Sequence, residues 1–144
     1  MKICLISDLH LSINPRLCKE AFFYEREGFK VVILVMWQSE DLLQRDMVIL
    51  GGHNIICRPY LDIIPGHISS LARNLLRLRK RFAAELQKWL GLGTKWAISH
   101  APEKMFKTVL DEDAELYSAH AECAFYVGRD LVKSGKKVIF DFEV

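Results

Sequence analysis

A strand, a helix and a second strand follow one another up to Trp37, which predicts an α/β fold: a Rossmann-like three-layer αβα sandwich with a mainly parallel sheet. The second strand, Lys30 to Trp37, is apolar without alternation, as expected where helices cover both faces of a sheet. The chain has 144 residues, 51% hydrophobic and 26% charged, which suits one folded domain. We therefore expect residues 1–144 to form a single domain.

The first half of the chain supplies three of the expected strands. The β-branched run Lys2 to Ser7 predicts a buried strand. A helix is expected from Pro15, which suits a first helical turn, to Gly28, which suits a helix end. After the second strand and a turn at 51–52, the run Asn54 to Cys57 predicts a third strand that ends at Arg58-Pro59.

The longest helical pattern extends from Ile68 to Leu90, and Gly91 and Gly93 close it. Apolar residues recur on it every three or four positions, at Leu71, Leu75, Leu78, Phe82 and Leu86. The remaining surface is basic, with Arg73, Arg77, Arg79, Lys80, Arg81 and Lys88. We expect the apolar ridge to pack on the sheet and the basic face to meet solvent. The alternative is peripheral membrane contact through this helix, since acidic headgroups attract basic amphipathic helices.

The last part of the chain predicts two more helices and two more strands. The expected elements are a helix over Ala101–Leu110, a solvated acidic turn at 111–113, a weak strand over Ala114–Ser118, a helix over Cys123–Lys133 and a closing strand over Lys137–Phe142. About five strands and four or more helices result. Ending on a strand predicts that residue 144 is a boundary within a longer protein and that half of a binding site lies elsewhere, because open α/β sheets bind ligands at the strand ends.

Charge and cysteine content exclude some classes of protein. The formal net charge of +2 argues against a nucleic-acid partner, because such proteins concentrate basic residues far more heavily. No window has the ~18 consecutive apolar residues of a membrane span, and the N-terminus lacks a secretory signal. The cysteines Cys4, Cys18, Cys57 and Cys123 include no C-x-x-C pair, which favours free thiols. We expect a cytoplasmic protein, with the inner membrane face as a site of peripheral contact.

The string ISDLHLS, Ile6 to Ser12, resembles the first motif of calcineurin-like metallophosphoesterases, in which an aspartate and a histidine ligate a metal. In this chain these residues are Asp8 and His10. A two-metal site needs about five to seven further ligands, and the G-D and G-N-H-[DE] motifs that supply them are missing. We therefore expect no metal site. Asp8 and His10 are instead candidates for lining a cleft at the strand end, or plain loop residues.

Three segments resemble, in order and spacing, the N-terminal domain of family 4-like glycosyltransferases of the GT-B type. The first is Asn14 to Ala21, followed by Gly28 to Val31; it looks like the opening helix of the family and the start of its second strand. The second, Ala114 to His120, resembles the strand motif D-[LVI]-[IY]-x-A-H. The third, Gly135 to Glu143, is similar to the closing strand G-x-x-[VL]-[VI]-[YF]-D-x-[HE].

The resemblance implies the acceptor-side half of a two-lobed enzyme. In that family a second Rossmann-like lobe holds the nucleotide-sugar donor, and catalysis takes place between the lobes without a metal. We expect the full-length protein to transfer a sugar to a small-molecule glycan or lipid-linked acceptor, and this domain alone to be inactive. The first loop lacks the Gly-Gly pair of many members, and Glu143 stands where many have histidine.

His120 is the predicted catalytic residue, because the resemblance implies that a histidine there faces the cleft. An imidazole can donate to a sugar hydroxyl or accept its proton near neutral pH. The alternative is a hydrogen-bonded structural histidine. Glu122 follows it, and it is predicted either to bind an acceptor hydroxyl or to cap the next helix.

Ser12, Asn14 and Arg16 lie where a loop meets a helix N-terminus, a natural anion site, so they are predicted to contact an acceptor phosphate. The alternative makes Asn14 a simple N-cap with Arg16 in solvent. Asp8 and Glu143 complete the predicted substrate-binding residues. Two further functions stay open: a non-enzymatic Rossmann-like module that binds a ligand or partner at its strand ends, and a metallophosphoesterase fragment.

Overall fold

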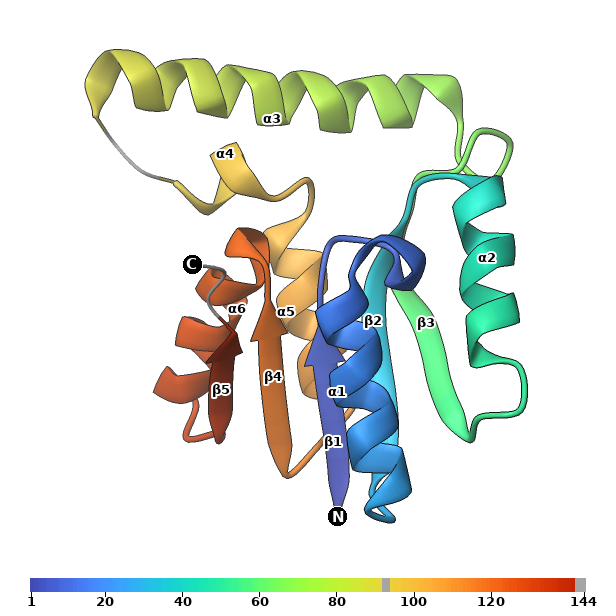
Figure 1. Cartoon of the computed structure of the whole chain (residues 1–144). Helices are drawn as coiled ribbons and strands as arrows, with labels where there is room; N and C mark the ends of the chain where they lie inside the picture. The colour runs from blue at the N-terminus through green and yellow to red at the C-terminus, as the bar shows by residue number, and fades with distance from the viewer. Residues whose placement is uncertain (92–93, 142–144) are drawn as a thin grey trace.

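The computed structural model describes residues 1–91 and 94–141 and contains a five-stranded, all-parallel sheet between two layers of helices (Figure 1). The strands lie in the order β3-β2-β1-β4-β5. This confirms the predicted Rossmann-like α/β fold. The strands are β1 (Lys2–Ile6), β2 (Lys30–Trp37), β3 (Ile55–Asp62), β4 (Leu116–His120) and β5 (Val138–Asp141).

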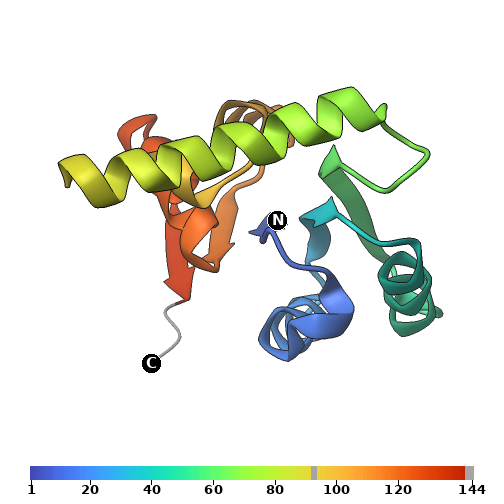
Figure 2. The same cartoon turned by 90° about the horizontal axis from the view of Figure 1, so that it is seen from above.

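The helices cover both faces of the sheet and one of its ends. α1 and α2 pack on one face, and α5 and α6 on the other (Figures 1 and 2). α3 crosses above the carboxyl ends of the strands, with the short α4 beneath it. The bounds are α1 (Pro15–Arg26), α2 (Glu40–Leu50), α3 (Ser70–Leu90), α4 (Lys95–Ile98), α5 (Pro102–Asp111) and α6 (Glu122–Lys133), with a 3-10 turn, η1, at Leu11–Ile13.

The two sides of the sheet form separate hydrophobic clusters. Alternate residues of a strand point to opposite faces, so Ile3 and Leu5 of β1 join the cluster under α1, whereas Cys4 and Ile6 join the one under α5 and α6. β2 follows the same alternation and is buried from Val31 to Met36. Burial on both faces explains why these strands are apolar throughout.

The strand order reverses between β1 and β4, which are hydrogen-bonded neighbours. The chain proceeds from β1 toward β3 on one side and from β4 to β5 on the other. In open α/β sheets the loops that diverge at such a point leave a crevice at the carboxyl ends of the strands. The residues that follow Ile6 and His120 therefore occupy the position where a ligand is expected.

Several elements differ from those expected. The short helix α4 was not expected, and β4 lies two residues later than the strand predicted over Ala114–Ser118. α2 was not expected from the sequence. β3 continues to Asp62, past Arg58-Pro59, where the sequence predicted its end. β3 is an edge strand, so the missing N–H of Pro59 is tolerated, and the register with β2 shifts just there, between Val35 and Met36.

The predicted solvated acidic turn is solvated only in part. Glu112 is 7% exposed, and its carboxylate lies 2.9 Å from Lys2 Nζ and 3.3 Å from Arg58 Nε. Lys2 lies on β1 and Arg58 on β3, so the Glu112 carboxylate connects the end of α5 to both strands. A buried carboxylate needs such partners, because desolvation of an unpaired charge is costly.

The apolar ridge of α3 does not pack on the sheet, contrary to expectation. Leu71 is 73% exposed, Phe82 71% and Trp89 83%. Leu76, on the opposite side of the helix, is the α3 residue that packs against the core. Within the described residues, no helix is long and apolar enough to cross a membrane.

The helix end and the cysteines agree with expectation where they are described. Gly91 ends α3 in a left-handed conformation, with φ of 65°, and its N–H donates to Gln87 O. Gly93 lies outside the described residues. All four cysteines are free thiols, and burial raises the pKa of the Cys57 thiol to about 12.

Candidate functional site

Polar side chains gather at the carboxyl end of β4 on the face covered by α1. His120 Nε2 lies 2.7 Å from Glu20 Oε2, and His120 Nδ1 lies 3.1 Å from Asp141 Oδ2. Arg16 NH1 is 3.6 Å from the other oxygen of Asp141. We call these four residues the His120 cluster. Its members come from α1, β4 and β5, which are distant in sequence.

Regular secondary structure places each member of the His120 cluster. His120 and Ser118 point to the same face of β4, and Ser118 Oγ lies 3.3 Å from Nε2. Asp141 is the register partner of His120 on the neighbouring strand. Arg16 and Glu20 are four residues apart on α1, so one helix face presents both. The cluster thus needs no irregular backbone.

Both ring nitrogens of His120 face carboxylates. A neutral imidazole has one N–H and can donate to only one carboxylate, whereas an imidazolium can donate to both. Burial tends to raise the pKa of the Glu20 carboxyl, but hydrogen bonds from His120, Ser118 and Tyr24 outweigh it and hold the pKa below its usual value. His120 is only 2% exposed, and its two carboxylate neighbours fix the orientation of its ring.

On the other face of the sheet, a cavity of about 370 Å³ opens at the same switch point. Asp8 from the loop after β1 and Glu122 from the first turn of α6 supply carboxylates, and Lys80 of α3 supplies a cation. We call this cavity the Asp8 pocket. It is lined by Asp8, Lys80, Ala97, Ile98, Ala121, Glu122 and Cys123.

A second cavity of about 340 Å³ shares Lys80 and Ala97 with the Asp8 pocket. Arg77, Arg81 and His100 also line it, so its wall is basic. Burial, followed by the charge of Lys80, lowers the pKa of His100. His100 is therefore neutral at neutral pH and can accept or donate a hydrogen bond there.

Ala121 separates the His120 cluster from the Asp8 pocket. Its φ of 69° and ψ of 159° lie in a region that is essentially restricted to glycine. Strained residues of this kind persist where the surrounding structure fixes them, and they gather at functional sites. Alternation along β4 points His120 to the face covered by α1, and Glu122, just past Ala121, lines the pocket on the other face.

The Cys123 thiol lies beside Asp8 and is unsuited to nucleophilic catalysis. Burial and the charge of Asp8 raise its pKa well above the usual value. A thiol must lose its proton to attack or to bind a metal. Cys123 therefore lines the Asp8 pocket as a buried, protonated thiol.

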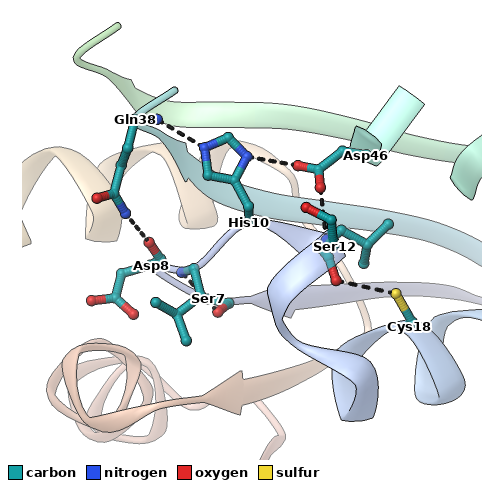
Figure 3. Close-up of polar contacts among 9 residues, drawn as sticks. Ser7, Asp8, His10, Ser12, Cys18, Gln38 and Asp46 are labelled. Carbon is teal, nitrogen blue, oxygen red and sulfur yellow. Dashed lines mark hydrogen bonds and ion pairs between the residues drawn. The ribbon is translucent and has the colours of Figure 1, made fainter. Parts of the chain in front are cut away.

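His10 is buried and structural (Figure 3). Its Nδ1 lies 2.8 Å from Asp46 Oδ2, and its Nε2 accepts a hydrogen bond of 2.9 Å from the Gln38 N–H. Since Nε2 accepts, Nδ1 must carry the proton and donate to Asp46. The backbone N–H of Ser12 donates to the second oxygen of Asp46, at 2.7 Å. His10 therefore does not line the cleft.

Asp8 and His10, the two residues of the metallophosphoesterase-like motif, are not arranged to share a metal. Figure 3 shows the side chains of Asp8 and His10 turned apart, and both ring nitrogens of His10 are engaged within the protein. A shared metal would require these two side chains to converge. In residues 1–91 and 94–141, no group of three or more His, Cys, Asp or Glu side chains gathers as a metal site.

The structure separates the remaining predicted residues. Asn14 Oδ1 accepts from the Leu17 N–H at 3.1 Å, so Asn14 is the N-cap of α1, as the alternative interpretation held. Ser12 lines a different cavity, against α2. Arg16 joins the His120 cluster, whereas Asp8 and Glu122 line the Asp8 pocket. Glu143 lies outside the described residues.

Three contributing residues were not singled out from the sequence. Glu20 follows Arg16 by four positions in the first segment of the resemblance, and Asp141 is the aspartate of the third. Those two signals were present. Lys80 was assigned only to the basic face of its helix, turned to solvent or to a membrane surface, and nothing local in the sequence indicates that α3 crosses the strand ends.

Fold and site together define a Rossmann-like α/β protein with polar groups on both sides of its topological switch point. No family model, no curated protein and no solved structure matches this chain. A fold of this class hosts many functions, and the residues of the site decide which one a protein performs.

Proposed function

We propose that this chain is the acceptor-binding lobe of a GT-B glycosyltransferase, which transfers a sugar from a nucleotide-sugar donor to a glycan or lipid-linked acceptor. One observation supports this most strongly. The three segments that resemble the family contribute Arg16 and Glu20, His120, and Asp141, and these side chains form one cluster. These residues also lie at the carboxyl ends of the strands beside the switch point, where open α/β folds bind their ligands.

In this proposal His120 handles the proton of the acceptor hydroxyl. An imidazole whose Nδ1 faces the hydroxyl can take up that proton, and the Glu20 carboxylate at Nε2 stabilises the imidazolium that forms. Asp141 lies at Nδ1 of the imidazole and pairs with Arg16 at 3.6 Å, and the Arg16 side chain is 52% exposed. An acceptor would displace this exposed pair to reach His120.

The Asp8 pocket would hold the neighbouring part of the substrate. Its volume of about 370 Å³ falls within the usual ~300–1,000 Å³ of small-molecule sites. The carboxylates of Asp8 and Glu122, which line it, would accept hydrogen bonds from sugar hydroxyls, and Lys80 would pair with an anionic group. The donor itself would bind mainly to a second lobe.

The test is a transfer assay on the intact gene product that contains this domain, with a panel of nucleotide sugars and saccharide acceptors. Removing the proton acceptor in His120→Ala is expected to lower kcat by roughly 10²- to 10⁴-fold. The matched control is His53→Ala, which removes a histidine from a 2.5 Å pair with Glu25, between α2 and β3 at the amino ends of the strands.

The control variant should retain wild-type turnover. A wild-type protein that transfers no sugar from any donor, while still binding saccharides, would favour the non-enzymatic module instead. Equal losses in both histidine variants would remove His120 from the mechanism.

A further inference from the structure

The apolar stripe of α3 faces away from the protein. Its residues recur every three or four positions and so share one helix face. Their exposed fractions range from 41% at Leu86 to 83% at Trp89. We define the α3 stripe as Leu71, Leu75, Leu78, Phe82, Leu86 and Trp89.

Contacts on the inner side fix this orientation. Leu76 packs against the core cluster under α5 and α6. The Arg79 guanidinium donates to His100 O at 2.8 Å and lies 3.7 Å from the centroid of the Trp96 ring. Because these contacts anchor the helix by its other faces, the stripe is left on the outside.

The α3 stripe has basic residues along its flank. At 100° per residue, Arg77, Arg81 and Lys88 align on one side of it. Lys88 pairs at 2.8 Å with Glu85, the one acidic residue of α3 against six basic residues. Arg77 and Arg81 also line the 340 Å³ basic cavity described above. The helix therefore presents an apolar face bordered by positive charge and a cavity suited to an anionic headgroup.

We propose that α3 docks the protein on an anionic phospholipid surface, with the α3 stripe at the boundary between headgroups and acyl chains and the basic flank against the phosphates. Monomeric proteins rarely leave a contiguous apolar patch of this kind exposed to water. Charge decides between occupants: a second copy docking through the same face would bring two basic helices together, whereas anionic lipid neutralises them. This inference does not depend on the glycosyltransferase assignment.

Docking through α3 would place the substrate site at the lipid surface. α3 crosses above the carboxyl ends of the strands (Figure 2), and its Lys80 lines the Asp8 pocket. A substrate carried on a membrane lipid would then approach the pocket from the side of the bilayer.

The first test is flotation with two kinds of vesicle: phosphatidylcholine alone, and phosphatidylcholine mixed with phosphatidylglycerol. The protein should float with the mixed vesicles and not with phosphatidylcholine alone. Added salt should release it, since screening weakens attraction to the headgroups. Equal binding to both vesicles, or binding to neither, would overturn the proposal.

Variants then separate the two contributions. Arg77→Gln/Arg81→Gln should weaken partitioning into mixed vesicles by roughly twenty- to thirtyfold, about fivefold per charge removed. The matched control Lys104→Gln/Lys107→Gln removes the same charge from exposed positions of α5 and should leave partitioning within about twofold of the wild type, a small electrostatic change at most. Comparable losses in both variants would show that net charge, and not α3, governs binding.

The apolar contribution has its own test. Leu78→Ser/Phe82→Ser should abolish flotation, whereas Val48→Ser, at an exposed apolar position of α2, should not. Acyl chains brominated near the headgroup should quench the fluorescence of Trp89, and Trp89→Phe should lose that quenching. Flotation that survives loss of the stripe, or a dimer in solution that Leu78→Ser/Phe82→Ser dissociates, would refute docking on lipid.

Discussion

At the residue scale, the imidazole of His120 depends on carboxylates that the fold brings from two other elements. Glu20 comes from α1 and Asp141 from β5, and both lie within 3.1 Å of a ring nitrogen. Such an arrangement fixes the orientation of the ring. His10 differs, because a backbone N–H donates to its Nε2 and only its Nδ1 faces a carboxylate. Neighbouring donors and acceptors thus hold the two rings in different ways.

The Glu20 carboxylate should contribute to the pH dependence of stability. Its pKa in the folded protein lies below the usual 4.5, so its contribution is present above pH 4.5 and is lost as the pH falls through the lower folded value. Urea unfolding across that range should show a steeper loss of the free energy of unfolding for the wild type than for Glu20→Gln.

Glu27→Gln provides the matched comparison, because Glu27 is exposed at the end of the same helix. This variant should follow the wild-type curve. If Glu20→Gln also follows it throughout, the carboxylate does not interact with His120 as the structure indicates.

At the element scale, α3 is the helix whose environment the sequence misjudged. Its period of three to four residues was recognised correctly, but an amphipathic pattern does not state which surface the apolar face meets. Leu76 and Arg79 attach α3 through its other faces, and these contacts involve distant residues such as Trp96 and His100. The sequence of α3 by itself does not indicate these contacts.

The exposure of the α3 stripe predicts a contrast in stability between two helices. Phe82→Ala should change the free energy of unfolding by no more than about 0.5 kcal/mol, because the side chain already meets solvent. Met105→Ala on α5, where the side chain is fully buried, should cost about 2–5 kcal/mol. Urea denaturation of the two variants measures both changes. A cost above about 2 kcal/mol for Phe82→Ala would mean that the stripe packs inward.

At the scale of the whole molecule, the sequence predicted which segments form strands more accurately than it predicted the first and last residue of each strand. β1, β2 and the βαβ unit were predicted because buried parallel strands are apolar on both faces. β3 was predicted too short, because Pro59 normally ends a strand and its place at an edge was not visible from local residues. α2 escaped prediction altogether.

The positions of the site were predicted from the sequence, but the contacts between its residues were not. Positions after Ile6 and His120 were predicted from the rule that ligands bind at the carboxyl ends of strands. Which residues meet there depends on the sheet order: β5 beside β4 brings Asp141 to His120, and Ala121 divides the two polar groups. Sheet order cannot be determined from local sequence. The residues predicted as one substrate site are therefore divided in the structure between the His120 cluster and the Asp8 pocket.

The central claim is that an acceptor binds where α1, β4 and β5 bring their polar side chains together. Histidine-selective NMR of this chain, titrated with a panel of monosaccharides, disaccharides and sugar phosphates, tests it most directly. A ligand that binds should shift the ring-nitrogen signals of His120 and leave those of His53 unchanged. Shifts confined to other histidines, with His120 unmoved at saturation, would contradict the claim.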